Sequence, residues 1–149
     1  MSGRTIGRPM EILLVEDSLV DARFTMNSLR GGDIRHRLTL VRDGEEALTF
    51  LRREGVFARA PRPDLILLDL LLPKLSGLEV LAAVREDEKL SEIPVVVLTG
   101  SVDDELRTQA ELLGVDGYIG KPVEWEKFLA MLRTLKDRWQ ADLLLPVEE

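Results

Sequence analysis

Hydrophobic residues gather in five short runs along the chain, each bounded by polar or turn-forming residues. The runs cover residues 12–15, 38–41, 65–68, 95–98 and 118–119, of which the last is the weakest. Continuous rather than alternating hydrophobicity is typical of strands that are buried on both faces of a parallel sheet. The five runs therefore predict the strands of a parallel sheet that is covered by helices.

The segments between these runs repeat hydrophobic residues at the spacing of amphipathic helices. Ser18, Asp43 and Asp103 can begin three of these helices as N-caps, and Gly31 and Gly114 follow the ends of two. Five strand–helix units predict an α/β fold, a doubly wound sheet with helices on both faces. The hydrophobic helix positions are Ala22, Met26, Leu29, Ala47, Leu48, Leu51, Val80, Leu81, Val84, Leu106, Ala110, Leu113, Phe128, Leu129, Leu132 and Leu135.

The length of 149 residues suits one domain. We expect a flexible leader over residues 1–9, a folded domain over 10–139 and a C-terminal tail over 140–149. No hydrophobic run approaches the roughly 20 residues that span a bilayer, and the first nine residues lack the apolar segment of a secretory signal. We therefore expect a cytoplasmic protein that makes no membrane contact.

Charge and residue usage exclude several kinds of function. The chain has 20 Lys and Arg against 27 Asp and Glu, a net charge of −7, which argues against a protein that binds nucleic acid through its phosphates. The absence of Cys excludes disulfides, thiolate zinc sites and cysteine nucleophiles. The one histidine, His36, leaves little room for a Ser-His-Asp triad.

Polar side chains follow four of the predicted strands. Glu16 and Asp17 follow the first, Asp69 the third, Thr99 the fourth and Lys121 the fifth. In a doubly wound sheet these carboxyl ends are where ligands bind. Each residue alone also has an ordinary interpretation as a helix cap, a strand-end hydroxyl or a solvated charge. Together, however, the three carboxylates would repel one another unless a cation neutralised them.

Two cations can neutralise the carboxylates. Oxygen ligands without Cys or His suit Mg²⁺, and Lys121 supplies an ammonium group. A metal, a lysine and the Thr99 hydroxyl around one carboxylate form a site for phosphoryl transfer, in which Asp69 attacks phosphorus.

These residues, in this order and at these strand ends, resemble the receiver domain of two-component response regulators, the domain of the chemotaxis receivers. The resemblance covers roughly residues 10–135. Residues 12–17, 42–47, 63–69 and 94–99 and the segment around Trp139 are most similar to single-domain regulators that partner phytochrome histidine kinases. The resemblance implies a flavodoxin-like (βα)5 sandwich with a parallel five-stranded sheet in the order 2-1-3-4-5.

By this resemblance, Asp69 accepts a phosphoryl group from a sensor histidine kinase, expected to be a phytochrome, and the protein is not an enzyme. Asp17, Asp69 and the backbone carbonyl of Leu71 would ligate Mg²⁺, and Glu16 would act through water. Lys121 would pair with Asp69 and then with its phosphate. The bond between Lys121 and the following proline is expected to be cis.

The resemblance also implies a conformational switch. Thr99 would move toward the phosphoryl group, and the ring of Tyr118 would turn inward when it does. Leu71 and Ser101 flank the approach of the water that hydrolyses the phosphoaspartate. Because an apolar Leu71 cannot orient that water, we expect slow autodephosphorylation.

We expect output through surface contacts rather than DNA. Trp125 and Trp139 suggest a homodimer through the last two helices and the strand between them, with isologous contacts. The alternative is that Trp139 and the leucines at 143–145 fold back onto their own subunit. Arg85, Arg107 and Arg133 are expected on solvated helix faces.

Three other functions fit the sequence less well or remain as alternatives. A haloacid dehalogenase-type phosphatase needs a second Asp where this chain has Leu71. A flavin or nucleotide carrier needs a Gly-rich phosphate loop after the first strand, where Glu16 and Asp17 stand instead. A phosphate sink, or a degenerate receiver acting as an adaptor, stays open as the alternative output.

Overall fold

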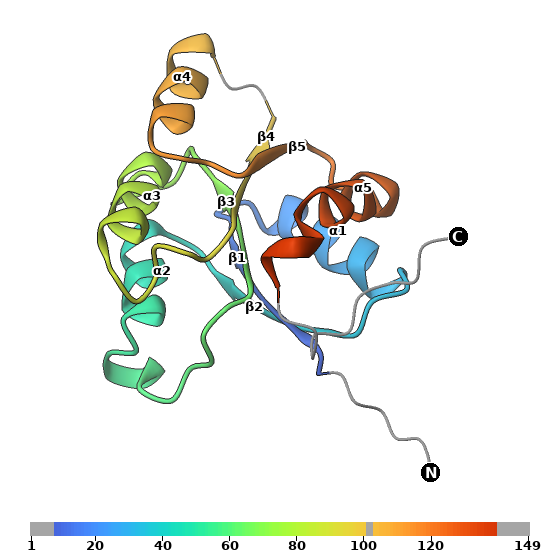
Figure 1. Cartoon of the computed structure of the whole chain (residues 1–149), viewed down its shortest axis with the longest axis horizontal. Coiled ribbons are helices and arrows are strands. Elements are labelled where there is room, and N and C mark those ends of the chain that lie inside the picture. Colours follow the sequence, from blue (N-terminus) through green and yellow to red (C-terminus); the bar gives the residue numbers. More distant parts are fainter. Residues whose placement is uncertain (1–7, 101–102, 140–149) are drawn as a thin grey trace.

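The computed structural model describes residues 8–100 and 103–139, so the predicted leader up to residue 7, Ser101 and the predicted tail 140–149 lie outside the described residues. Five parallel strands form one sheet in the order β2-β1-β3-β4-β5 (Figure 1), which confirms the expected fold. The strands are β1 (Met10–Val15), β2 (His36–Val41), β3 (Leu65–Asp69), β4 (Val95–Thr99) and β5 (Gly117–Gly120).

Helices cover both faces of the sheet. One face is covered by α1 (Leu19–Arg30) and α5 (Trp125–Leu135), and the other by α2 (Gly44–Leu51), α3 (Gly77–Glu86) and α4 (Asp104–Leu112) (Figure 1). Short 3-10 helices, η1 (Gly55–Phe57) and η2 (Lys136–Arg138), follow α2 and α5. No helix within 8–100 and 103–139 is long and apolar enough to cross a membrane.

The two layers have separate cores because side chains alternate along each strand. In β1, Leu13 packs into the core beneath α2, α3 and α4, whereas Ile12 and Leu14 pack into the core beneath α1 and α5. All three are essentially buried. The continuous hydrophobicity of the strand therefore serves both faces of the sheet.

Helix starts follow the predicted caps. The side chains of Ser18, Asp43 and Asp103 each accept a hydrogen bond from a backbone N–H three residues later, at 3.2, 2.8 and 2.8 Å. Gly114, after α4, has φ +82°, a left-handed conformation that favours glycine.

Two helices bury different residues from those expected. In α1, Ala22 and Leu29 are buried as expected, but Thr25 is buried in place of Met26, which is only half-buried. In α5 Met131 is buried, whereas Leu129 is half-buried. Because successive helix residues are about 100° apart, the spacing defines a stripe but not which of two neighbours at its border faces the sheet.

Candidate functional site

Four strands deliver polar side chains to one edge of the sheet. Glu16 follows β1, Asp69 ends β3, Thr99 ends β4 and Lys121 follows β5. The strands are in parallel register, in which Thr99 pairs with Gly120, the residue before Lys121. The structure therefore brings these four predicted site residues to the carboxyl ends of neighbouring strands.

The ammonium group of Lys121 lies among three carboxylates. Its Nζ is 2.8 Å from Oε1 of Glu16, 3.0 Å from Oδ2 of Asp69 and 3.2 Å from Oδ2 of Asp21. The peptide bond between Lys121 and Pro122 is cis, as expected. Lys121 thus links β1, β3 and the first turn of α1.

Asp69 is held through both carboxylate oxygens. Oδ1 accepts a hydrogen bond from the backbone N–H of Leu71 at 2.9 Å, and Oδ2 accepts one from Lys121. Only 13% of the side chain is exposed. This orientation leaves a fixed, partly accessible carboxylate at the end of the central strand β3.

Glu16 is the most buried of these acids, with 1% of its side chain exposed. Oε2 accepts a hydrogen bond from the N–H of Ser18 at 3.2 Å. Oε1 is buried and lies 2.8 Å from the Lys121 ammonium, an ion pair rather than a directed hydrogen bond among the described residues. Burial raises the pKa of Glu16, Lys121 opposes that rise, and neighbouring Asp69 adds to it.

The carboxylates keep Lys121 charged. Burial by itself lowers the pKa of Lys121, but hydrogen bonds and charge from Glu16 and Asp69 outweigh it and raise the pKa above its usual value. The side chain is therefore a cation at neutral pH, which suits an anion that arrives at Asp69.

Thr99 and Tyr118 lie on neighbouring strands beside Lys121. The Thr99 hydroxyl is 3.5 Å from the carbonyl of Ile119, a weak contact that leaves the group free to turn. The ring of Tyr118 lies under the guanidinium of Arg107, 4.2 Å from its Cζ, and its hydroxyl donates to the Arg107 carbonyl at 3.2 Å. Tyr118 is thus directed toward α4.

Asp17 is exposed, and its backbone rather than its carboxylate is held. Its carbonyl accepts hydrogen bonds from Nε and Nη2 of Arg42 at 3.2 and 2.8 Å. Arg42 and Asp21 are site neighbours that the sequence analysis missed. Asp21 carried a usable signal, since it lies one helical turn after Asp17; Arg42 carried none, because its contact depends on how two loops pack.

The donor set fits a divalent cation in chemistry and charge. Three acids, Glu16, Asp21 and Asp69, contact the Lys121 ammonium, so the carboxylates of this cluster outnumber its lysine. All the donors are oxygens, as Mg²⁺ and Mn²⁺ prefer. Among the described residues, no three acidic or histidine side chains are already gathered around one point where an ion could bind.

The two tryptophans pack against their own domain. Nε1 of Trp139 donates to the carbonyl of Asp64 at 2.7 Å, and the ring contacts the core beneath α1 and α5. The Trp125 ring fills the space beside Gly32, where even a Cβ atom would lie 2.2 Å from it. This favours the alternative in which Trp139 folds back; residues 143–145 lie outside the described part.

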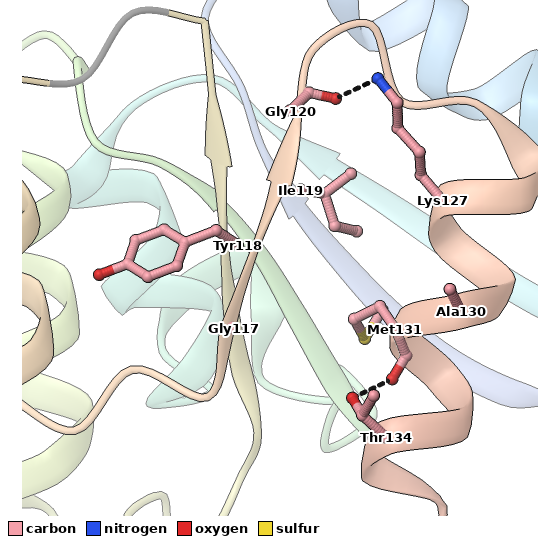
Figure 2. Close-up of a pocket in the computed structure, with 8 residues that line it drawn as sticks. All are labelled: Gly117, Tyr118, Ile119, Gly120, Lys127, Ala130, Met131 and Thr134. Atoms are coloured by element: carbon pink, nitrogen blue, oxygen red, sulfur yellow. Dashed lines mark hydrogen bonds between the residues drawn. The ribbon is translucent and has the colours of Figure 1, made fainter.

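A separate hollow of about 360 Å³ lies between β5 and α5. Figure 2 shows Ile119, Lys127 and Met131 around it, with the Tyr118 ring pointing away on the other side of the strand. Its lining includes none of the carboxylates that contact Lys121. The hollow is therefore distinct from the edge that carries the candidate chemistry.

A family model described as "Response regulator receiver domain" matches residues 12–133. Among curated proteins, the chain is similar to "Response regulator Rcp1" of Synechocystis sp., with 40% identity over 138 residues, 93% of this chain and 94% of the relative.

Solved structures give the same relationship. A Mn²⁺-bound form of Rcp1 has a TM-score of 0.74 and covers 93% of this chain and 100% of that one. The phosphorylated cyanobacterial phytochrome response regulator RcpA is 39% identical, with a TM-score of 0.76 over 94% and 100% of the two chains. The bacteriophytochrome response regulator RtBRR is also 39% identical, with a TM-score of 0.79 over 95% and 84%.

Proposed function

The chain belongs to the response regulator receiver domain family, and from that premise we propose that it accepts a phosphoryl group on Asp69 from a sensor histidine kinase. It is a signalling receiver rather than an enzyme in the usual sense. The observation that carries the proposal is the Lys121 ammonium between Asp69 and Glu16, at 3.0 and 2.8 Å. That arrangement holds a nucleophile beside a cation that can bind the incoming phosphate.

In the proposed reaction, a carboxylate oxygen of Asp69 forms a bond to phosphorus. The bond from phosphorus to the donor's histidine nitrogen breaks, and the imidazole leaves with the electron pair. Lys121 and the Thr99 hydroxyl bind the phosphoryl oxygens, whose negative charge they stabilise. The N–H of Leu71 holds the other Asp69 oxygen and so fixes the direction of attack.

We assign Asp17, Asp69, the Leu71 carbonyl and, through water, Glu16 as the residues that would hold Mg²⁺. The bound ion would neutralise the acidic edge and the phosphoryl oxygens. The oxygen-only donor set supports this assignment, as does the Mn²⁺ form of the similar protein Rcp1.

The expected partner is a phytochrome kinase, on the strength of the similarity to RcpA and RtBRR, which are described as phytochrome response regulators. An exposed apolar surface lies beside the site: Leu19, Val20 and Phe24 of α1 are 45%, 78% and 43% exposed, and Leu71 is 63% exposed. Such a surface suits a protein that must approach Asp69 closely. We place the reaction in the cytoplasm, where a kinase finds its ATP.

Phosphorylation is proposed to act through Thr99 and Tyr118, with the Tyr118 ring leaving its place under Arg107. The α4-β5-α5 face would then change, and a homodimer through it would pass the signal on. That face carries Leu112 of α4, which is 82% exposed, and the hollow in Figure 2. Light scattering before and after phosphorylation tests this output against a phosphate sink, which would stay monomeric.

The decisive experiment is phosphorylation of the protein by acetyl phosphate with Mg²⁺, followed by intact mass spectrometry. We expect one phosphoryl group on the wild type and none on Asp69→Asn. An Asp33→Asn variant, which changes an exposed acid in the turn before β2, away from this edge, is the matched control and should be phosphorylated normally. Incorporation that persists in Asp69→Asn would overturn the assignment.

A further inference from the structure

A second hollow lies at the opposite end of the sheet, where the strands begin. It has a volume of about 390 Å³ and is lined by Pro9, Arg30, Ile34, Arg35, His36 and Arg37. Arg30 ends α1, and His36 and Arg37 begin β2. The strand pairing sets this hollow beside the start of β1, where Met10 pairs with His36.

Among the described residues, every ionisable side chain that lines the hollow is basic. This contrasts with the net charge of −7 of the whole chain. The nearby acids are already engaged or outside the lining: Glu11 pairs with Arg37 at 3.1 Å, and Asp64 is bound by both Nη atoms of Arg8 at 2.8 Å. Asp33 is exposed in the preceding turn and does not line the hollow.

The arginines keep most of their hydrogen-bonding capacity. The Arg37 side chain is 72% exposed despite its pair with Glu11. Arg30 uses one Nη1 contact, with Asn27 at 3.3 Å. Within residues 8–100 and 103–139, the Arg35 guanidinium makes no hydrogen bond or ion pair. The Arg35 carbonyl accepts a hydrogen bond from the Met10 N–H at 3.0 Å.

His36, the one histidine of the chain, also lines the hollow. Nδ1 of His36 lies 3.2 Å from the carbonyl of Ile34, which favours the tautomer with the proton on Nδ1. Nε2 is then the ring nitrogen without that backbone contact. A guanidinium presents its donors as a planar fork that matches carboxylate and phosphate oxygens.

We infer that this hollow, defined by Arg30, Arg35, His36 and Arg37, is a binding site for a small polyanion that carries phosphate or carboxylate groups. Its volume lies in the range of small-molecule sites. The C-terminal end of α1 points its partial negative charge here, and Arg30 offsets that charge. The site is independent of Asp69, because it lies at the other end of the strands.

The test is an NMR titration of the ¹⁵N-labelled protein with pyrophosphate and, separately, with citrate, without Mg²⁺ and at low salt. His36 gives an unambiguous signal because the chain has no other histidine. We expect saturable shifts at His36 and the amides of 35–37, with a dissociation constant of about 1 mM or below. The ratio of the two constants identifies phosphate or carboxylate as the preferred group.

Arg35→Ala and Arg37→Ala should each weaken binding about fivefold or more, since each removes one charged fork. Arg59→Ala removes the same charge from an exposed position elsewhere and should leave binding unchanged. Asp69→Asn should also bind normally, which separates this site from the proposed phosphoryl acceptor. Shifts centred on Lys121 would overturn the inference, and so would an Arg59→Ala variant that weakens binding as much as the other two. A glutamate-rich peptide that binds more than about tenfold more tightly than either anion would also overturn it.

Discussion

The ammonium group of Lys121 forms an ion pair with the buried carboxylate of Glu16. Removing one partner of a buried ion pair commonly costs about 3–5 kcal/mol, since the other charge stays behind unpaired. We expect Lys121→Ala to lower the free energy of unfolding, measured in urea without Mg²⁺, by about 2–4 kcal/mol.

The double variant Glu16→Gln/Lys121→Ala is the control for that prediction. Its carboxamide carries no charge, so the double variant should recover at least half of the stability lost by Lys121→Ala. If Lys121→Ala is no less stable than the wild type, the ion pair has no structural role.

Leu71 is the residue whose side chain we expect to set the lifetime of the phosphate. It is 63% exposed beside Asp69 and has no group that could orient water. Leu71→Asn supplies an amide and should shorten the half-life of phospho-Asp69, by about tenfold, as expected for general positioning of a water. Loss of radiolabel from purified phosphoprotein measures it, and Leu71→Met is the control; an unchanged half-life in Leu71→Asn would count against this role.

At the scale of single elements, α1 offers a contact surface next to the acceptor. Val20 is 78% exposed, and its neighbour Asp21 contacts Lys121. Val20→Asp should slow phosphotransfer from a purified phytochrome kinase about tenfold or more, because it places a charge in an apolar contact. Phosphorylation by acetyl phosphate, which needs no docking, should not change.

Val56→Asp is the matched control for the α1 surface. Val56 is 93% exposed in η1, which follows α2 on the other layer. Equal slowing by both variants would show that charge alone, rather than docking on α1, affects transfer.

Gly44 begins α2 where the backbone of Leu75 approaches closely. A Cβ atom at Gly44 would lie 2.0 Å from the Leu75 carbonyl oxygen, so Gly44→Ala must move the loop before α3. We expect a loss of about 1–3 kcal/mol in the free energy of unfolding. Gly31→Ala is the control: Gly31 has φ −80° and meets nothing closer than 3.4 Å, so alanine should be neutral or stabilise by up to about 1 kcal/mol.

Strands and caps could be predicted because their signals are local. The run at 65–68 is buried on both faces, and Ser18 caps its helix through a neighbour three residues away. Spacing could not predict whether Thr25 or Met26 is the buried residue, because this depends on how α1 is rotated against the sheet.

The candidate site likewise has residues that the sequence could predict and residues that it could not. Asp69 and Lys121 could be placed at one edge because topology decides where strand ends meet. Arg42 could not, because its bond to Asp17 depends on loop packing. The expectation that Arg85 is solvated was wrong: its side chain is 18% exposed and bonds to the carbonyls of Gly114 and Ile93.

At the scale of the whole molecule, Asp116 joins parts that are distant in sequence. Its carboxylate accepts hydrogen bonds from Arg85 of α3 at 2.7 Å, from the N–H of Val95 at 2.8 Å and from Arg138 of η2. Asp116→Ala should cost about 2–4 kcal/mol in urea unfolding, since it removes the carboxylate that pairs with two arginines and leaves the Val95 N–H without this acceptor.

Lys127→Ala is the comparison for Asp116→Ala. Lys127 pairs with Glu124 at 3.7 Å, and both side chains are about half exposed, at 45% and 55%. Such pairs contribute about 1 kcal/mol at most. Equal losses in both variants would show that the Asp116 network does not hold the layers together.

Asp64, just before β3, contacts both Arg8 and Trp139, which lie at the two ends of the described part of the chain. Its carboxylate binds Arg8, and its carbonyl binds the indole of Trp139. Both segments are therefore anchored at the edge of the sheet opposite Asp69. A circular permutant that joins these segments through a short linker, or a fluorescent protein fused after Trp139, should leave the approach to Asp69 clear. Biosensors can thus be built from this receiver without obstructing the phosphoryl donor.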